Sequence, residues 1–190
     1  MDYRRAVAAD APAMAELFAA NHHDALTERE RARQGFVQGD LDAEALRSMA
    51  VGGSLLVADD DGRLAGLLGL ASPKDLPSAP PPVRALLDAQ DALEWRGRPL
   101  RSTPFLLYGP VVVAADYRGK GVARGLFTAA LRAASGRADV MVAFIELANR
   151  ASWHVHVDGF GMVPLGEFTL GDRAYGVVGA STRPAATPAT

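Results

Sequence analysis

The stretch Gly109–Phe127, GPVVVAADYRGKGVARGLF, decides how the rest of the sequence is interpreted. It opens with the β-branched run Val111–Val113, which favours a strand, and ends in an apolar pattern with helical spacing. Between the two lies Arg118-Gly119-Lys120-Gly121. The first backbone N–H groups of a helix have no intrahelical acceptor, and glycines let an anion approach them closely. The stretch therefore predicts a site for a phosphate or pyrophosphate group.

A plain turn explains the same residues without a ligand, because glycine also permits a tight change of direction between a strand and a helix. The stretch lacks the G-x-x-x-x-G-K-[ST] pattern of nucleotide-binding P-loops and the G-x-G-x-x-G pattern of dinucleotide-binding domains. Both the anion site and the plain turn stay open on these residues alone, whereas NTP and NAD sites are disfavoured.

The composition of the 190-residue chain indicates one domain with a substantial core, since 49% of the residues are hydrophobic. The net charge is −2 with both signs interspersed, so we expect no nucleic-acid partner. The chain has no cysteine, which excludes disulfides and thiolate chemistry and is compatible with a reducing compartment. No secretory signal pattern is present, and no apolar run approaches the ~20 residues that cross a bilayer. We expect a cytoplasmic protein with no membrane partner.

The predicted elements follow the order β-α-α-β-β, an inserted helix, then β-α-β-α-β-β. This order predicts an α/β (α+β) fold with a mixed sheet covered by helices on both faces. We expect a single domain over residues 1–180, with an inserted loop and helix at 72–103, and a disordered tail over 181–190, which is rich in Ala, Pro and Thr.

Two helices are predicted from local signals. Asp40 is the expected N-cap of a helix over Leu41–Met49, with Leu41, Ala45 and Met49 facing inward. Within the insertion, Pro82 is expected in the first turn of a helix that ends near Arg96.

The hexapeptide Arg118–Ala123 resembles the [RQ]-x-x-G-x-[GA] loop of the GNAT superfamily of N-acetyltransferases. The resemblance implies that this loop and the following helix start hold the pyrophosphate of acetyl-CoA, while Val111–Val113 line the pantetheine arm. By element order it extends over Tyr3–Val178, and it implies a mostly antiparallel central sheet in which two strands are splayed around the arm. Pro110, which has no N–H, independently favours a bulge in that strand.

A second stretch, ANRASWHVHVDGFGM over Ala148–Met162, is similar to a later motif of that family. The matching residues are Asn149, Ser152, His156, Gly159 and Phe160. The spacing from His156 to Gly159 is one residue shorter than the common pattern, so counting back from Gly159 places Val155 at the family's tyrosine. The residues expected to bind the cofactor are Val111, Val112, Val113, Arg118, Gly119, Lys120, Gly121, Val122, Ala123, Arg124, Asn149 and Ser152.

Acyl transfer from a thioester to an amine needs a neutral amine, a stabilised oxyanion and a proton for the leaving thiolate. In the family a tyrosine supplies that proton, and we expect His156 to supply it here as an imidazolium. Glu146 is the expected base, acting directly or through water, and the resemblance implies an oxyanion-binding N–H near Val113. Simpler interpretations are a packed His156 and a solvated Glu146. No metal is expected, because His154 and His156 are two residues apart and do not share a helical face.

The expected function is acetyl-CoA-dependent N-acetylation of a primary amine, carried by a small molecule or a peptide, by direct transfer in a ternary complex. Two alternatives are a catalytically inactive CoA-binding sensor or scaffold and a general phosphoanion-binding module. The sequence does not select an acceptor, and the resemblance implies a possible homodimer.

Overall fold

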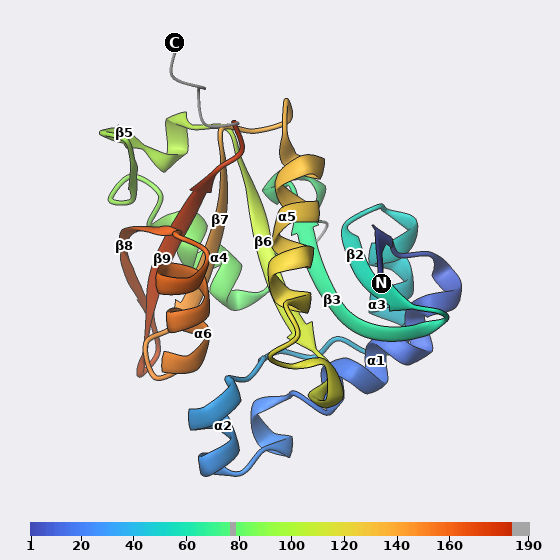
Figure 1. Cartoon of the computed structure of the whole chain (residues 1–190). Coiled ribbons are helices and arrows are strands. Elements are labelled where there is room, and N and C mark those ends of the chain that lie inside the picture. Colours follow the sequence, from blue (N-terminus) through green and yellow to red (C-terminus); the bar gives the residue numbers. More distant parts are fainter. Residues whose placement is uncertain (77–78, 184–190) are drawn as a thin grey trace, which may run out of the picture.

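The computed structural model describes residues 1–76 and 79–183, and these are built around a seven-stranded sheet. Its strand order is β1-β2-β3-β6-β7-β9-β8, and all neighbours are antiparallel except β6 and β7 (Figure 1). The mostly antiparallel, mixed sheet that we expected is therefore confirmed. The strands are β1 (Asp2–Arg5), β2 (Leu55–Asp60), β3 (Arg63–Ala71), β6 (Phe105–Val113), β7 (Val140–Glu146), β8 (Val163–Leu170) and β9 (Arg173–Ser181).

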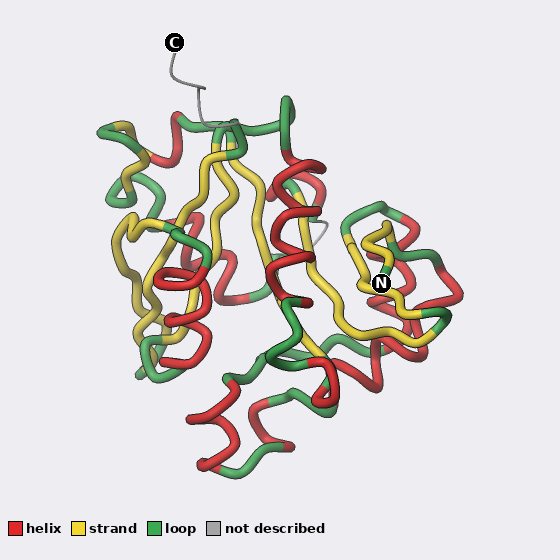
Figure 2. Tube along the Cα trace, in the orientation of Figure 1, coloured by secondary structure: helices red, strands yellow, loops and turns green. Residues whose placement is uncertain are grey.

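Helices cover both faces of this sheet (Figure 2). On one face, α5 buries its apolar side against β2, β3, β6 and β7. On the other face, α1 and α3 pack on one half of the sheet and α4 packs on the other half. The helices are α1 (Ala11–Ala19), α2 (Glu28–Gln34), α3 (Ala43–Val51), α4 (Pro81–Asp88), α5 (Val122–Ala134) and α6 (Arg150–His154).

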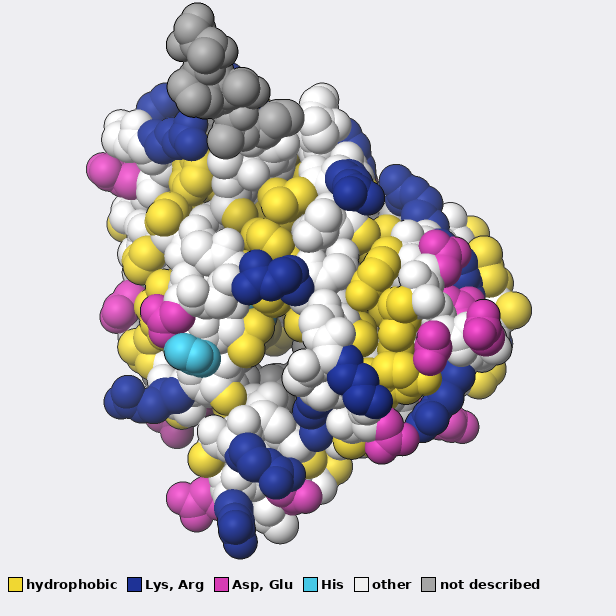
Figure 3. Space-filling view, viewed as in Figure 1, with side chains coloured by type: hydrophobic (Ala, Val, Ile, Leu, Met, Phe, Trp, Pro, Cys, Tyr) yellow, Lys and Arg dark blue, Asp and Glu magenta, His cyan; other side chains and the backbone are white. Residues whose placement is uncertain are grey.

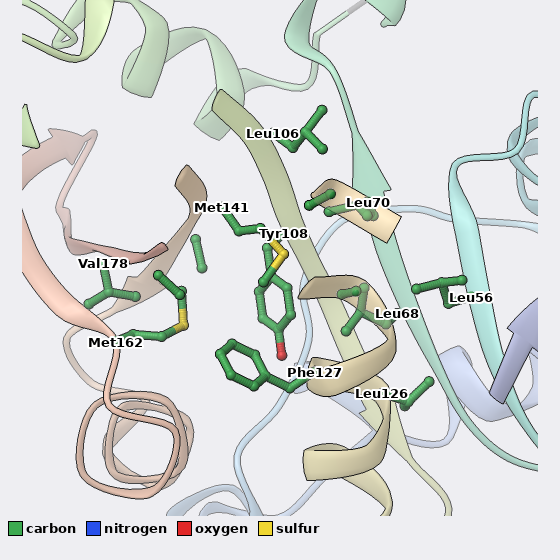
Figure 4. Packing of buried hydrophobic residues seen from close by; sticks show 14 of the residues in the cluster. Leu56, Leu68, Leu70, Leu106, Tyr108, Leu126, Phe127, Met141, Met162 and Val178 are labelled. Atoms are coloured by element: carbon green, nitrogen blue, oxygen red, sulfur yellow. The ribbon is translucent and has the colours of Figure 1, made fainter. Parts of the chain in front are cut away.

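The side chains of β6 alternate between the two cores, as strand geometry requires. Leu106 and Tyr108 lie in the core beneath α5 (Figure 4). Leu107 lies in the core beneath α4. The same alternation places Met141 of β7 beneath α5 and Val142 beneath α4. The sheet is thus a shared wall between two hydrophobic layers.

The predicted start of α3 is wrong by two residues. The helix begins after Asp42, whose carboxylate accepts a hydrogen bond from the backbone N–H of Ala45 at 2.8 Å. Its buried residues are Leu46 and Ala50. Two acidic residues compete for the cap position in this sequence, and the packing of α3 against α1 selects the phase that buries Leu46.

The predicted helix from Pro82 to Arg96 is too long. The chain leaves α4 at Asp88 and forms a small hairpin, β4 (Glu94–Trp95) and β5 (Arg98–Pro99). Its turn, Arg96-Gly97, has positive φ angles of 52° and 76°, which end any helix. The physical reason is burial, because the hairpin delivers Trp95 to the core beneath α4. Residues 77–78 of the insertion lie outside the described residues.

The sheet opens between β6 and β7. Their parallel pairing covers three residues of each strand and ends at Leu107 and Val142. Beyond that point β6 carries an irregularity opposite Gly69, where Gly109 and Pro110 interrupt the ladder with β3. The expected bulge at Pro110 and the expected splaying of the two strands are confirmed. The opening points toward the start of α5.

At the C-terminal end, β9 includes Ser181, which the sequence places in the tail. Thr182 is also buried, and the rest of the predicted tail, residues 184–190, lies outside the described residues. No helix in the described ranges combines the length and the apolar composition that crossing a membrane requires.

Candidate active site

A cleft of about 930 Å³ lies where β6 and β7 part, between the start of α5, the α6 region and α2. In the space-filling view the surface is hollowed between these elements, and basic side chains lie around the hollow (Figure 3). Of the residues expected to bind the cofactor or to act on it, those lining the cleft are Val111, Val112, Val113, Arg118, Gly119, Gly121, Val122, Ala123, Arg124, Ser152 and His156. Three expected residues, Lys120, Asn149 and Glu146, do not line it.

The start of α5 carries unused hydrogen-bond donors. Gly121 is the N-cap residue, with a φ of 82°, and it provides no side chain to cap the helix. Among the described residues, the backbone N–H groups of Gly119, Gly121, Val122 and Ala123 have no acceptor. A left-handed N-cap and four free donors at the positive end of a 13-residue helix fit an anion that the backbone itself holds.

Two basic side chains flank this helix start in different ways. The guanidinium of Arg124 donates to the carbonyl of Gly159 at 2.8 Å and lies 5.4 Å from the ring centroid of Phe160. This contact fastens α5 to the segment after α6, at the edge of the cleft. The ammonium of Lys120 instead lies 5.5 Å from the ring centroid of Tyr117, outside the cleft lining.

Arg118 connects the loop to the opposite wall of the cleft. Its guanidinium donates to the side-chain oxygen of Asn21 at 2.6 Å and to that of Gln34. Asn21 is buried and donates in turn to the carbonyl of Leu17 in α1. Arg118 thus joins the loop before α5 to α1 and α2.

Asn149 holds the structure together behind the cleft. Its side-chain oxygen accepts from the N–H of Ser152 at 3.2 Å and so caps α6. Its amide nitrogen donates to the carbonyl of Phe36 at 2.9 Å, which ties α6 to the segment after α2. The cap and the tie occupy both ends of the amide group of Asn149. The other members of this motif, Ser152, His156, Gly159 and Phe160, line the cleft.

The segment after α6 continues as a π-helical turn, Val155–Gly159. It turns His156 inward, with 7% of its surface exposed, and leaves Val155 on the outside at 38%. Val155 and His156 both line the cleft, and His156 is the more deeply buried of the two. Nδ1 of His156 donates to the carbonyl of Ser152 at 2.8 Å, and burial lowers the pKa of the imidazole.

Tyr108 is a residue that no sequence motif singles out. It follows Leu107, the last residue of β6 that pairs with β7, and its ring meets His156 edge-on with 5.5 Å between centroids. The hydroxyl end lies beside Phe127 of α5 (Figure 4). Burial raises the pKa of the phenol, so the hydroxyl keeps its proton. The only local signal was a polar tip in the apolar run before Pro110, which sequence spacing does not connect to His156.

Glu146 ends β7 on the sheet face opposite the α5 core. Its carboxylate accepts from the side-chain amide of Gln38 at 2.6 Å, and the guanidinium of Arg173 lies 3.9 Å away. The hydroxyl of Tyr175 donates to the other end of the same Gln38 amide at 3.4 Å. Glu146 therefore belongs to a polar cluster outside the cleft lining.

The electrostatic character of the cleft is uniform. Its lining contains three arginines and two histidines and no Asp or Glu. The described residues also hold no group of three or more His, Cys, Asp or Glu side chains placed to bind a metal ion. A cationic lining and free helix-start amides together complement a ligand with several phosphates.

Comparisons with known proteins agree with this geometry. Residues 13–162 match the acetyltransferase (GNAT) family. Similar solved structures include a GNAT-family acetyltransferase from Streptococcus agalactiae, with a TM-score of 0.68, 13% identity and 96% coverage of each chain. YncA from Salmonella typhimurium, solved with its cofactor acetyl-CoA, has a TM-score of 0.62 and 19% identity over 100% of this chain and 98% of that chain. A ribosomal-protein-alanine N-acetyltransferase from Brucella melitensis has a TM-score of 0.61 and 19% identity, with 95% and 99% coverage. These identities establish a shared fold only, and none of the curated proteins matches the sequence.

Proposed function

Because the chain belongs to the acetyltransferase (GNAT) family, we propose that it transfers the acetyl group of acetyl-CoA to a primary amine by direct transfer in a ternary complex. The observation that carries the proposal is the set of unpaired N–H groups at the start of α5, set in a cleft without acidic side chains. Backbone donors of this kind bind phosphate oxygens and do not depend on a particular side chain. A protein with the same fold, YncA, was solved with acetyl-CoA, which supports the choice of this phosphate-bearing ligand.

The roles of individual residues follow from their positions around the cleft. The amides of Gly119, Gly121, Val122 and Ala123 would hold the pyrophosphate, and Arg124 would add charge beside them. The stretch Val111–Val113 of β6, which lines the cleft, would contact the pantetheine arm, and its backbone would provide the oxyanion donor near Val113. Acetyl-CoA supplies an activated thioester, and the chain contributes its orientation and the transfer of protons.

The two expected proton carriers receive unequal support. A neutral, buried His156 does not suit the imidazolium donor that we expected, because burial lowers its pKa. Glu146 stays a candidate base only through intervening water, since its carboxylate is held by Gln38 outside the cleft lining. Asn149 and Lys120 are better suited to supporting the site than to contacting the cofactor. A cytoplasmic location and a homodimer stay predictions.

Calorimetric titration followed by an amine screen tests the proposed function. We expect micromolar binding of acetyl-CoA, much weaker binding of ADP and ATP, and release of free CoA thiol with at least one amine from a panel of peptides, polyamines, amino acids and aminoglycosides. Binding of CoA without thiol release would favour the sensor or scaffold function. Equal affinity for simple nucleotides would favour a general phosphoanion-binding module, and no binding by the folded protein would overturn the cofactor assignment.

A further inference from the structure

Two buried side chains beneath the cleft have unused hydrogen-bonding atoms. In the described part of the chain, the hydroxyl of Tyr108 and Nε2 of His156 are the buried side-chain polar atoms without a partner. The two residues are 4% and 7% exposed, and their rings are in edge-to-face contact. Unpartnered polar atoms this deeply buried are rare in native proteins, so their occurrence side by side calls for an explanation.

The two atoms have complementary hydrogen-bonding character. Because Nδ1 of His156 faces the carbonyl of Ser152, the ring proton of the neutral imidazole is on Nδ1 and Nε2 carries a lone pair. The hydroxyl of Tyr108 is protonated and is a donor. Nε2 of His156 is therefore a hydrogen-bond acceptor, and the neighbouring hydroxyl of Tyr108 is a hydrogen-bond donor.

The pair lies at the point where the sheet opens. The pairing between β6 and β7 ends at Leu107 and Val142, and Tyr108 is the next residue of β6. His156 lines the cleft from the other side. The ring of Phe160 meets His156 edge-on with 5.4 Å between centroids, is only half-buried and also lines the cleft.

We propose that Tyr108 protonates the leaving sulfur and that Nε2 of His156 takes the proton from the attacking amine, an inference that rests on the proposed acetyl transfer. The amine nitrogen forms a bond to the acetyl carbon, the carbon–sulfur bond breaks, and the hydroxyl of Tyr108 gives its proton to the thiolate. The amine gives one proton to Nε2 of His156. That proton then passes from His156 to the tyrosinate, which restores both side chains and leaves the acetylated amine and the free thiol.

Replacing only the hydroxyl tests the role of Tyr108. We expect Tyr108→Phe to lower kcat on the order of 100-fold or more, which is the usual loss when a positioned proton donor is removed. The calorimetric Kd and the KM for acetyl-CoA should stay within about twofold, because the ring is retained. The unfolding temperature should not fall, because the variant removes an unpartnered buried hydroxyl. Tyr3→Phe, on strand β1 and outside the cleft lining, is the matched control and should keep wild-type kcat.

The outcomes separate this inference from the proposed function. An active wild-type protein together with a fully active Tyr108→Phe variant would overturn the role of Tyr108 alone. A wild-type protein that binds acetyl-CoA but releases no thiol with any amine would overturn the acetyl transfer, and this step with it. A fall in kcat accompanied by an equal loss of acetyl-CoA binding would indicate a structural role and would also overturn the step.

A second measurement needs no turnover. Nitrogen-15 NMR of the histidine rings at neutral pH, assigned with the His156→Gln variant, should show a neutral His156 with its proton on Nδ1. Addition of CoA should shift the Nε2 resonance, since the thiol end of the ligand comes to lie beside it. A proton found on Nε2 in the free protein, or an Nε2 resonance that CoA leaves unchanged, would overturn the role of His156.

Discussion

The start of α5 and the Tyr108–His156 pair both contain polar groups without a hydrogen-bond partner, but the two regions differ in which groups these are and in how far they are buried. At α5 the unused groups are backbone amides that face the open cleft. Beneath the cleft they are side-chain atoms that are closed off from solvent. Water satisfies the exposed amides in the absence of ligand, whereas an unpartnered buried polar atom costs roughly 1–3 kcal/mol. This difference matches the roles proposed above, in which the start of α5 binds the cofactor and the Tyr108–His156 pair transfers protons.

The largest expected effect comes from the first region. Gly121→Glu should lower the affinity for acetyl-CoA on the order of 100-fold or more, because a carboxylate would occupy the space before four free amides and repel the phosphates. Calorimetry measures the loss directly.

Gly136 provides a matched control at the other end of α5. Its φ is 76°, against 82° at Gly121, and a Cβ atom added at either glycine would meet no other atom within 4 Å. Gly136→Glu therefore introduces the same strain and the same charge away from the cleft, and it should bind acetyl-CoA like the wild type. An equal loss of affinity in both variants would mean that the effect arises from helix destabilisation and not from an anion site.

The next effect tests whether Asn149 binds the cofactor or stabilises the fold. Asn149→Ala should lower the free energy of unfolding by about 2 kcal/mol, because it removes the cap of α6 and leaves the carbonyl of Phe36 without its donor. For a chain of this size the loss corresponds to a fall of about 4–8 °C in Tm.

Asn149→Ser sharpens this measurement, since its hydroxyl can still cap α6 but has no second arm to donate to the carbonyl of Phe36. We expect it to lie between the wild type and Asn149→Ala in thermal unfolding. Unchanged unfolding temperatures combined with weaker acetyl-CoA binding would instead make Asn149 a cofactor ligand, which is the role that the sequence motif suggested.

The smallest effect is a dependence of stability on pH that originates in His156 of the Tyr108–His156 pair. Burial lowers the pKa of His156 below 6.5 in the folded protein, so the unfolded chain binds a proton more readily. The stability that comes from the neutral ring is present above pH 6.5 and is lost as the pH falls from there through the folded pKa. Between pH 7.5 and 5.5 the wild type should lose about 1 kcal/mol relative to His156→Gln. Parallel denaturation curves for the two proteins across this range would contradict a buried neutral His156.

The two regions also differ in how well the sequence predicted them. Gly119 and Gly121 were assigned correctly to a strand-to-helix turn, and the structure leaves the following amides free, because a left-handed N-cap is a local property that glycine itself supplies. The opening between β6 and β7 was predictable for a similar reason, since Pro110 interrupts its own ladder. Tyr108 gave no such signal, because its partner comes from a distant turn of the chain.

The two wrong helix predictions, for α3 and α4, have one physical cause. Asp40 and Asp42 are equivalent caps by sequence, and only the packing of Leu46 chooses between them. The hairpin at Arg96-Gly97 replaces a helical continuation because the core beneath α4 accepts Trp95. In each case local preferences were nearly balanced, and burial decided the outcome.

The sequence by itself determined the mixed sheet, the family and the glycine turn before α5, because periodicity, glycine and proline act over a few residues. The tertiary structure alone decided that His156 and not Val155 faces inward, that Asn149 supports α6, and that Tyr108 meets His156. These features depend on which side chains are removed from water together, and burial of that kind exists only once β6, α5 and the turn after α6 have packed against one another.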